Sequence, residues 1–180
     1  MARTLDETAP DDFRDPAIGA LYAAHRHQII ELIPHVRERC AIVESRTQLF
    51  HLDYHPMNIL MRDRKVVAIL DFEWFGSAFE LAGLGFSAFK FIRQTMVDPT
   101  MHAIESRQPT LVRRWNEAWK QAGRDGYRST DLGLGARYRI LFLIRKILGC
   151  MRSGDGKYTY DLGKQMVSLL EAEQIFGPLI

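Results

Sequence analysis

One stretch of this chain, residues 50–75 (FHLDYHPMNILMRDRKVVAILDFEWF), constrains the fold more than any other. Its middle holds two short apolar runs, residues 58–61 and 65–70, on either side of the charged turn Arg62-Asp63-Arg64. Runs rich in β-forming residues that are joined by a short polar turn predict a β-hairpin. We therefore expect a hairpin at this point and look for chemistry at its two ends.

Polar side chains bracket the predicted hairpin: Asp53, His55 and Asn58 precede it, and Asp71 and Glu73 follow it. Because a hairpin returns its two ends to the same place, Asn58 and Asp71 should lie side by side, with Asp53 one loop away. Carboxylates gathered without Lys or Arg among them repel one another unless a cation offsets their charge. Oxygen ligands of this kind suit Mg²⁺ better than Zn²⁺, so the stretch predicts a magnesium site.

The spacing Asp-x-x-x-x-Asn, followed by a strand pair and Asp-Phe, matches the catalytic and metal-binding loops of kinases. The segments HLDYHPMN and ILDFEW resemble the catalytic core of the aminoglycoside phosphotransferase and choline kinase superfamily, small-molecule kinases with a protein-kinase-like fold. The resemblance implies that Asp53 is the catalytic base and that Asn58 and Asp71 bind Mg²⁺, with ATP as phosphoryl donor. Glu73 stands where choline-kinase-like members tend to carry an acid. Leu52 departs from the small residue that the family usually has before the aspartate.

Two histidines flank Asp53 in the pattern His51-x-Asp53-x-His55, and both are candidate supporting residues of the site. We interpret His51 as a structural histidine whose ring binds loop backbone. The chemical alternative is a zinc cluster in a metal-dependent hydrolase. That cluster needs another ligand downstream, and only His102 is available there.

The rest of the chain predicts an α+β fold that is mainly α, and no strand is expected after Glu73. Apolar residues recur at helical spacing in five segments, which cover residues 17–43, 79–95, 110–122, 130–151 and 160–176. Pro34 should kink or divide the first helix. In the fourth, Phe142 is expected to be buried, whereas Arg137, Arg139 and Lys146 are expected on a solvated face. About five helices and a small hairpin correspond to the C-terminal lobe of such a kinase.

The length and the net charge of the chain limit how many domains it can form and which kinds of partner it is expected to bind. The chain has 180 residues, of which 47% are hydrophobic, enough for one core over residues 17–180 behind a flexible leader at 1–16. A net charge of +2 gives no reason to expect nucleic acid or a membrane as partner. The acidic start is not a signal peptide, and Cys40 and Cys150 stand far apart, which favours reduced thiols in the cytoplasm.

A complete kinase places a Gly-rich loop and a strand lysine upstream of its catalytic aspartate. Upstream of Asp53 there is no lysine, and the only glycine is Gly19. We therefore expect the N-terminal nucleotide-clamping lobe to be supplied by a longer polypeptide or by another chain, or else the protein to be a degenerate relative. The lobe, or a second copy in a homo-oligomer, should dock on the hairpin and on the first helix around Leu21, Ile29 and Ile33.

Two functions stay open at this point. The first is an ATP- and Mg²⁺-dependent phosphotransferase that acts on a hydroxyl group of a small molecule. The second is a non-catalytic, kinase-like binding module that holds a partner or a metabolite without turnover. The intact set of Asp53, Asn58 and Asp71 favours the first function, and the missing upstream elements favour the second.

Overall fold

The computed structural model describes residue 9 and residues 16–43, 47–97, 108–123, 127–152 and 159–178. The fold in this part is mainly helical, as the sequence predicts, and it holds two small antiparallel sheets. Its helices are α2 (Pro16–Val43), α3 (Glu80–Val97), α4 (Gln108–Gln121), α5 (Ser129–Arg152) and α6 (Thr159–Phe176). None of these described helices combines the length and the apolar character that a membrane span requires. Apart from residue 9 and Pro16, the predicted leader lies outside the described residues.

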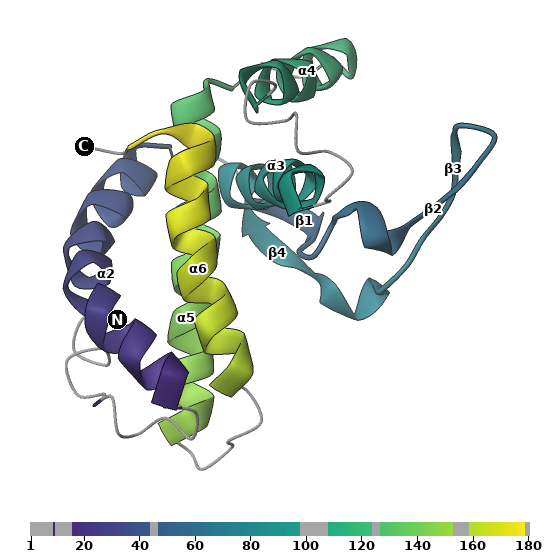
Figure 1. The fold of residues 1–180 in the computed structure, drawn as a ribbon. Helices are drawn as coiled ribbons and strands as arrows, with labels where there is room; N and C mark the ends of the chain where they lie inside the picture. Colours follow the sequence, from purple (N-terminus) through teal and green to yellow (C-terminus); the bar gives the residue numbers. More distant parts are fainter. Residues whose placement is uncertain are drawn as a thin grey trace.

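The core lies between the long helices. Figure 1 shows α5 and α6 side by side, with α2 along them and α3 against α5. Their facing sides bury a continuous apolar cluster that includes Tyr22, Ile29, Phe89, Ile140 and Leu162. The expectation that the first helix presents a free docking face is therefore wrong, because that face is the part of α2 that packs on the core. Pro34 lies inside α2 and does not divide it.

Two glycines allow α3 and α5 to approach each other closely. A Cβ atom on Gly85 would lie 2.3 Å from the carbonyl oxygen of Leu132, and one on Gly135 would lie 2.0 Å from that of Leu81. Both distances are far below van der Waals contact with backbone atoms that cannot rotate away. This close crossing brings residues of α3 and α5 onto the walls of one pocket.

The predicted hairpin is present. Strand β2 (Ile59–Arg62) pairs antiparallel with β3 (Lys65–Ile69), and the turn residues Asp63 and Arg64 have φ of 50° and 64°. Two consecutive positive φ angles are the geometry of the tight turn whose twist matches that of a hairpin. Figure 1 shows the hairpin projecting from the helical body, and its apolar side chains are exposed: Leu60, Met61, Val66, Val67 and Leu70.

A second sheet corrects the prediction that the chain is helical after Glu73. Strand β4 (Phe75–Phe79) pairs antiparallel with β1 (Thr47–His51), so that His51 lies opposite Phe75. The segment FGSAF has glycine and serine at its centre, which are poor helix formers. An extended segment at β1 also needs a partner for its backbone groups, and β4 supplies it.

Three side chains of α5 also lie where the sequence analysis did not expect them. Arg137 is 2% exposed and Arg139 is 8% exposed, whereas Phe142 is 44% exposed. Arg137 donates a hydrogen bond to the carbonyl oxygen of Gly177 just after α6, which ties the two helices together. Burial also lowers the pKa of the Arg137 guanidinium, and Glu173 partly opposes this effect.

We predict that Gly135→Ala destabilises the fold by about 1–3 kcal/mol, because the added methyl group overlaps the Leu81 carbonyl. Urea denaturation followed by far-UV circular dichroism measures the change in the free energy of unfolding. Gly149→Ala on the same helix is the matched control: nothing lies within 4 Å of its added Cβ, so it should gain up to about 1 kcal/mol from helix propensity. Equal effects of the two substitutions would contradict the proposed close crossing.

Candidate active site

His51 links the two halves of the site. The side chain is buried at the end of β1, and its Nε2 lies 2.6 Å from the carbonyl oxygen of Leu70, just before Asp71. Its Nδ1 accepts a hydrogen bond of 3.3 Å from the backbone N–H of Asp53. A neutral ring with the proton on Nε2 satisfies both contacts. The loop after β1 is thereby held against the end of β3.

Asn58 strengthens the same link. The side-chain Nδ2 of Asn58 donates a hydrogen bond of 3.0 Å to the backbone carbonyl of Asp53. The backbone carbonyl of Asn58 accepts a hydrogen bond of 2.9 Å from the N–H of Leu70. The side chain is buried, and the carboxamide oxygen Oδ1 is the atom that remains able to coordinate a cation. Leu70, the backbone partner of Asn58, directly precedes Asp71. The hairpin therefore brings Asn58 and Asp71 close together, as the sequence predicts.

Asp71 has an unusual backbone and an exposed carboxylate. Its φ of 65° and ψ of 43° lie in the left-handed region, which Asp tolerates better than most residues. The side chain faces solvent and makes no capping hydrogen bond to the short turn Phe72–Trp74 that follows. A carboxylate and a carboxamide at neighbouring positions form an oxygen-only donor set, which fits Mg²⁺.

Asp53 itself is held by two side chains. Its Oδ1 lies 3.1 Å from Nζ of Lys90 on α3, and its Oδ2 lies 3.3 Å from Nε2 of His55. Lys90 is a site residue that the sequence analysis missed. The available signal was a lysine in the middle of the apolar pattern SAFKFI, since a cation in a buried helix requires a partner.

Burial shapes the electrostatics of both partners. Desolvation lowers the pKa of Lys90, and the attraction to Asp53 partly opposes this effect. Desolvation also lowers the pKa of His55 from 6.5, again with Asp53 opposing. The His55 ring therefore favours the neutral form, in which Nδ1 accepts from the N–H of Met57 at 3.3 Å and Nε2–H donates to Asp53.

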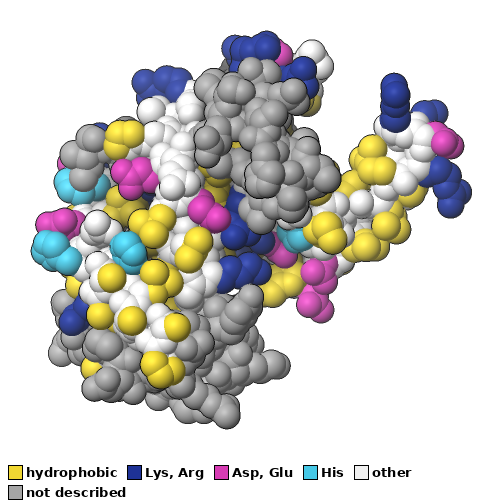
Figure 2. Space-filling model, viewed as in Figure 1, with side chains coloured by type: hydrophobic (Ala, Val, Ile, Leu, Met, Phe, Trp, Pro, Cys, Tyr) yellow, Lys and Arg dark blue, Asp and Glu magenta, His cyan; other side chains and the backbone are white. Residues whose placement is uncertain are grey.

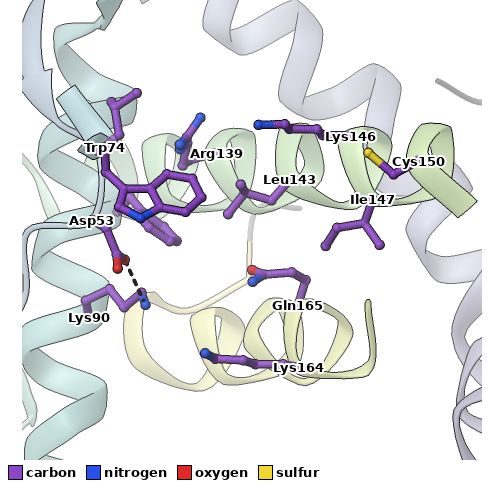
Figure 3. Close-up of a pocket in the computed structure, with 12 residues that line it drawn as sticks. Asp53, Trp74, Lys90, Arg139, Leu143, Lys146, Ile147, Cys150, Lys164 and Gln165 are labelled. Atoms are coloured by element: carbon purple, nitrogen blue, oxygen red, sulfur yellow. Dashed lines mark ion pairs between the residues drawn. The ribbon is translucent and has the colours of Figure 1, made fainter. Parts of the chain in front are cut away.

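A pocket of about 190 Å³ opens beside Asp53 between α3, α5 and α6 (Figure 3). Its apolar wall is formed by Leu52, Trp74, Phe86, Leu143 and Ile147. Counting the described residues alone, its charged lining holds one acid, Asp53, and four cations, which are Lys90, Arg139, Lys146 and Lys164. Figure 2 shows Lys and Arg side chains gathered in the hollow between α6 and the base of the hairpin. Leu52 fits because Gly76 opposite it has no side chain: a Cβ there would lie 2.9 Å from Cδ1 of Leu52.

The zinc alternative finds no support in this geometry. Within the described ranges, no three His, Cys, Asp or Glu side chains are placed to hold a metal ion. Both ring nitrogens of His51 already bind backbone groups, and His102 lies outside the described residues. Glu73 is exposed and does not line the pocket beside Asp53.

Comparison with known proteins gives the class. The sequence model of the phosphotransferase enzyme family matches residues 2–132, well over half of the chain, and the chain therefore belongs to this family. This membership confirms the resemblance to the aminoglycoside phosphotransferase and choline kinase superfamily. Neither the search of curated proteins nor the search of solved structures found a match. The matched region contains Asp53, Asn58, Asp71 and Lys90 and ends within α5.

We predict that His55 makes the stability of the fold depend on pH. The pKa of His55 in the folded state is lowered below its ordinary value of 6.5. At pH values between the folded-state pKa and 6.5, the unfolded chain therefore binds more protons than the folded one. The free energy of unfolding of the wild type should therefore rise with pH across this window. In His55→Asn, whose side chain can still accept from Met57 N–H, part of that slope should disappear.

Urea denaturation at a series of pH values measures the slope. His27→Asn is the matched control, because the His27 side chain is 85% exposed on α2 and pairs with Glu31 one turn along the same helix. An unchanged slope in the His55 variant would mean that the ring is not desolvated beside Asp53.

Proposed function

We propose that this chain forms the catalytic lobe of a kinase that transfers the γ-phosphoryl group of Mg²⁺-bound ATP to a hydroxyl group of a small molecule. The observation that carries this proposal is the position of Asp53. Its carboxylate lines the pocket, and its backbone carbonyl accepts a hydrogen bond from the side chain of Asn58. The hairpin that begins after Asn58 ends next to Asp71, so both predicted metal ligands lie close to Asp53. Membership of a phosphotransferase family supports the same reaction class.

In this reaction Asp53 orients the acceptor hydroxyl and takes its proton. The hydroxyl oxygen forms a bond to the γ-phosphorus, the bond from that phosphorus to the β,γ-bridging oxygen breaks, and ADP leaves. Lys90 and His55 fix the two carboxylate oxygens in place. A positioned base of this kind contributes roughly 100- to 10,000-fold to the rate.

Asn58 and Asp71 are the residues that would hold Mg²⁺. A bound Mg²⁺ would supply positive charge that offsets the negative charge developing on the phosphates. The chain's own contribution is to keep the two ligands in register, through the backbone bonds between Asn58 and Leu70 and the left-handed backbone at Asp71. Two protein ligands leave room for the phosphate oxygens that usually complete the coordination of Mg²⁺.

The nucleotide-clamping lobe of such a kinase would dock on the hairpin. Its outward side chains include Met61, Val66 and Val67, which are between 52% and 57% exposed. Apolar side chains gathered on a projecting hairpin mark an interaction surface. We therefore assign this surface to the clamping lobe, supplied by a further segment or by another chain, with a second copy of this chain as the alternative occupant.

The first prediction from this function concerns the metal. Mn²⁺, used as a paramagnetic substitute for Mg²⁺, should broaden the NMR signals of residues next to Asn58 and Asp71. The broadening should be weak without nucleotide, because the phosphates supply missing ligands. Asp71→Ala should remove it, whereas Glu117→Ala, which deletes an exposed carboxylate on α4, should leave it unchanged. Equal broadening in the wild type and in Asp71→Ala would refute the assignment.

The second prediction concerns Asp53. In the assembly that contains the clamping lobe, we expect Asp53→Asn to lower phosphoryl transfer from ATP by roughly 100- to 10,000-fold. The Kd for the nucleotide should hardly change, since the carboxylate of Asp53 faces the pocket and not the metal ligands. Radiolabel transfer from ATP to a panel of small hydroxyl compounds measures turnover, and equilibrium dialysis measures Kd.

Asp131→Asn, which alters a carboxylate that pairs with Arg128 outside the pocket, is the control and should keep full activity. Full activity in Asp53→Asn would reject Asp53 as the base. Equal losses in Asp53→Asn and His55→Ala, together with activity that requires Zn²⁺, would favour the hydrolase alternative instead.

A further inference from the structure

The pocket beside Asp53 carries more positive charge than the proton transfer needs. Among the described residues that line it, four cations face one acid, Asp53, and of these four only Lys90 forms an ion pair with that acid. In the part of the chain that the structure describes, no acid forms an ion pair with Arg139, Lys146 or Lys164. These three cations come from α5 and α6 and lie on the walls of one small cavity (Figure 3).

Arg139 is the cation in this pocket with the strongest indication of an anion-binding role. Its side chain is 8% exposed, and its Nε has no hydrogen-bond partner among the described residues. The guanidinium lies over the rings of Phe86 and Phe142, with its central carbon 6.0 Å and 5.2 Å from their centroids. A buried cation without a hydrogen-bonded anion is costly, so a protein retains one where a ligand offsets its charge.

The other two cations extend this positive surface. Nζ of Lys146 lies 5.9 Å from the centroid of the Trp74 ring, which forms part of the apolar wall. Lys164 projects from α6 on the opposite side of the cavity (Figure 3) and lies close enough to Lys90 to help lower its pKa. A positively charged ligand placed here would be repelled from both sides.

We propose that the acceptor of this kinase is a small hydroxyl compound that carries a carboxylate or a phosphate group. Arg139, Lys146 and Lys164 would bind the anionic group, while the hydroxyl group points at Asp53. This inference rests on the proposed function and adds the class of substrate to it. It departs from the aminoglycosides and choline that give the superfamily its name, because those compounds are cations.

We assign the anionic group that this pocket would bind to the acceptor and not to the nucleotide. Neither Asn58 nor Asp71, the predicted metal ligands that would face the phosphates of ATP, lines this pocket. Three of the four cations also lie beyond residue 132, where the match to the family ends. Residues that all family members need for ATP chemistry are expected inside the matched region, whereas residues that select the acceptor can differ between members.

A set of probes with one carbon skeleton tests the charge preference: glycerol, glycerate, glycerol phosphate and aminopropanediol. Isothermal titration calorimetry on the full chain should show that glycerate, glycerol phosphate or both bind more tightly than glycerol, and that the cationic aminopropanediol does not bind. Comparing the two anions tells whether the pocket takes a carboxylate or a phosphate. Tightest binding by aminopropanediol, or equal binding by all four probes, would overturn the proposal.

Variants locate the binding. Lys146→Met should weaken binding of the anionic probe by roughly 10- to 100-fold, the usual effect of losing a hydrogen bond to a charged group. Arg145→Met is the matched control, because Arg145 is exposed on α5 next to Lys146 but does not line the pocket. Arg139→Met should weaken binding and also raise the unfolding temperature of the free protein, since it removes an unpaired buried charge. Equal affinity in the Lys146 and Arg145 variants would overturn the proposal.

Three further outcomes distinguish a failure of this inference from a failure of the proposed kinase function. If Mg²⁺-ATP competes with the anionic probe, the pocket belongs to the nucleotide and the proposal is wrong. If radiolabel from ATP reaches only aminopropanediol, the kinase function stands and the anionic acceptor is rejected. If the anions bind through Lys146 but no phosphoryl transfer occurs in the complete assembly, the pocket stands and the kinase function is rejected.

Discussion

The contact that the rest of the site depends on is the pair of hydrogen bonds made by the ring of His51. One joins Nε2–H to the carbonyl of Leu70, and the other joins Nδ1 to the N–H of Asp53. These bonds fix the distance between the loop that carries the base and the strand end that carries Asp71. Losing either one leaves a partly buried backbone group without its partner, at a cost of about 1 kcal/mol. The ring therefore sets the spacing between Asp53 and Asp71, the proposed base and the proposed metal ligand.

Charge in the pocket follows from helix packing. Because Gly85 and Gly135 let α3 and α5 touch at the backbone, Lys90 from one helix and Arg139 from the other line the same small volume. Lys90 forms an ion pair with Asp53, whereas Arg139 forms none with a described residue and is only attracted to Asp53 from a distance, while its Nε has no hydrogen-bond partner there. The same close crossing that packs the core thus gathers the positive charge on which the proposed acceptor preference rests.

The prediction from the sequence succeeded where the information is local. The hairpin and the neighbouring positions of Asn58 and Asp71 follow from turn chemistry and from the pairing of two adjacent strands. It failed at β4, whose partner β1 lies more than twenty residues earlier, and at Arg139, which helical periodicity alone placed in solvent. Periodicity locates an apolar face, but it does not show which cations a second helix will cover.

The sequence by itself determined the class of chemistry, because the spacing of Asp53, Asn58 and Asp71 is a local pattern that the match to the phosphotransferase enzyme family also covers. Only the tertiary structure decided what surrounds the base. Lys90, Arg139 and Lys164 stand on three different helices and far apart in the sequence, so no local pattern relates them. Their meeting depends on the crossing of α3 with α5 and on the packing of α6 beside it. The proposed acceptor preference therefore rests on helix packing, whereas the family pattern rests on one hairpin and its flanking loops.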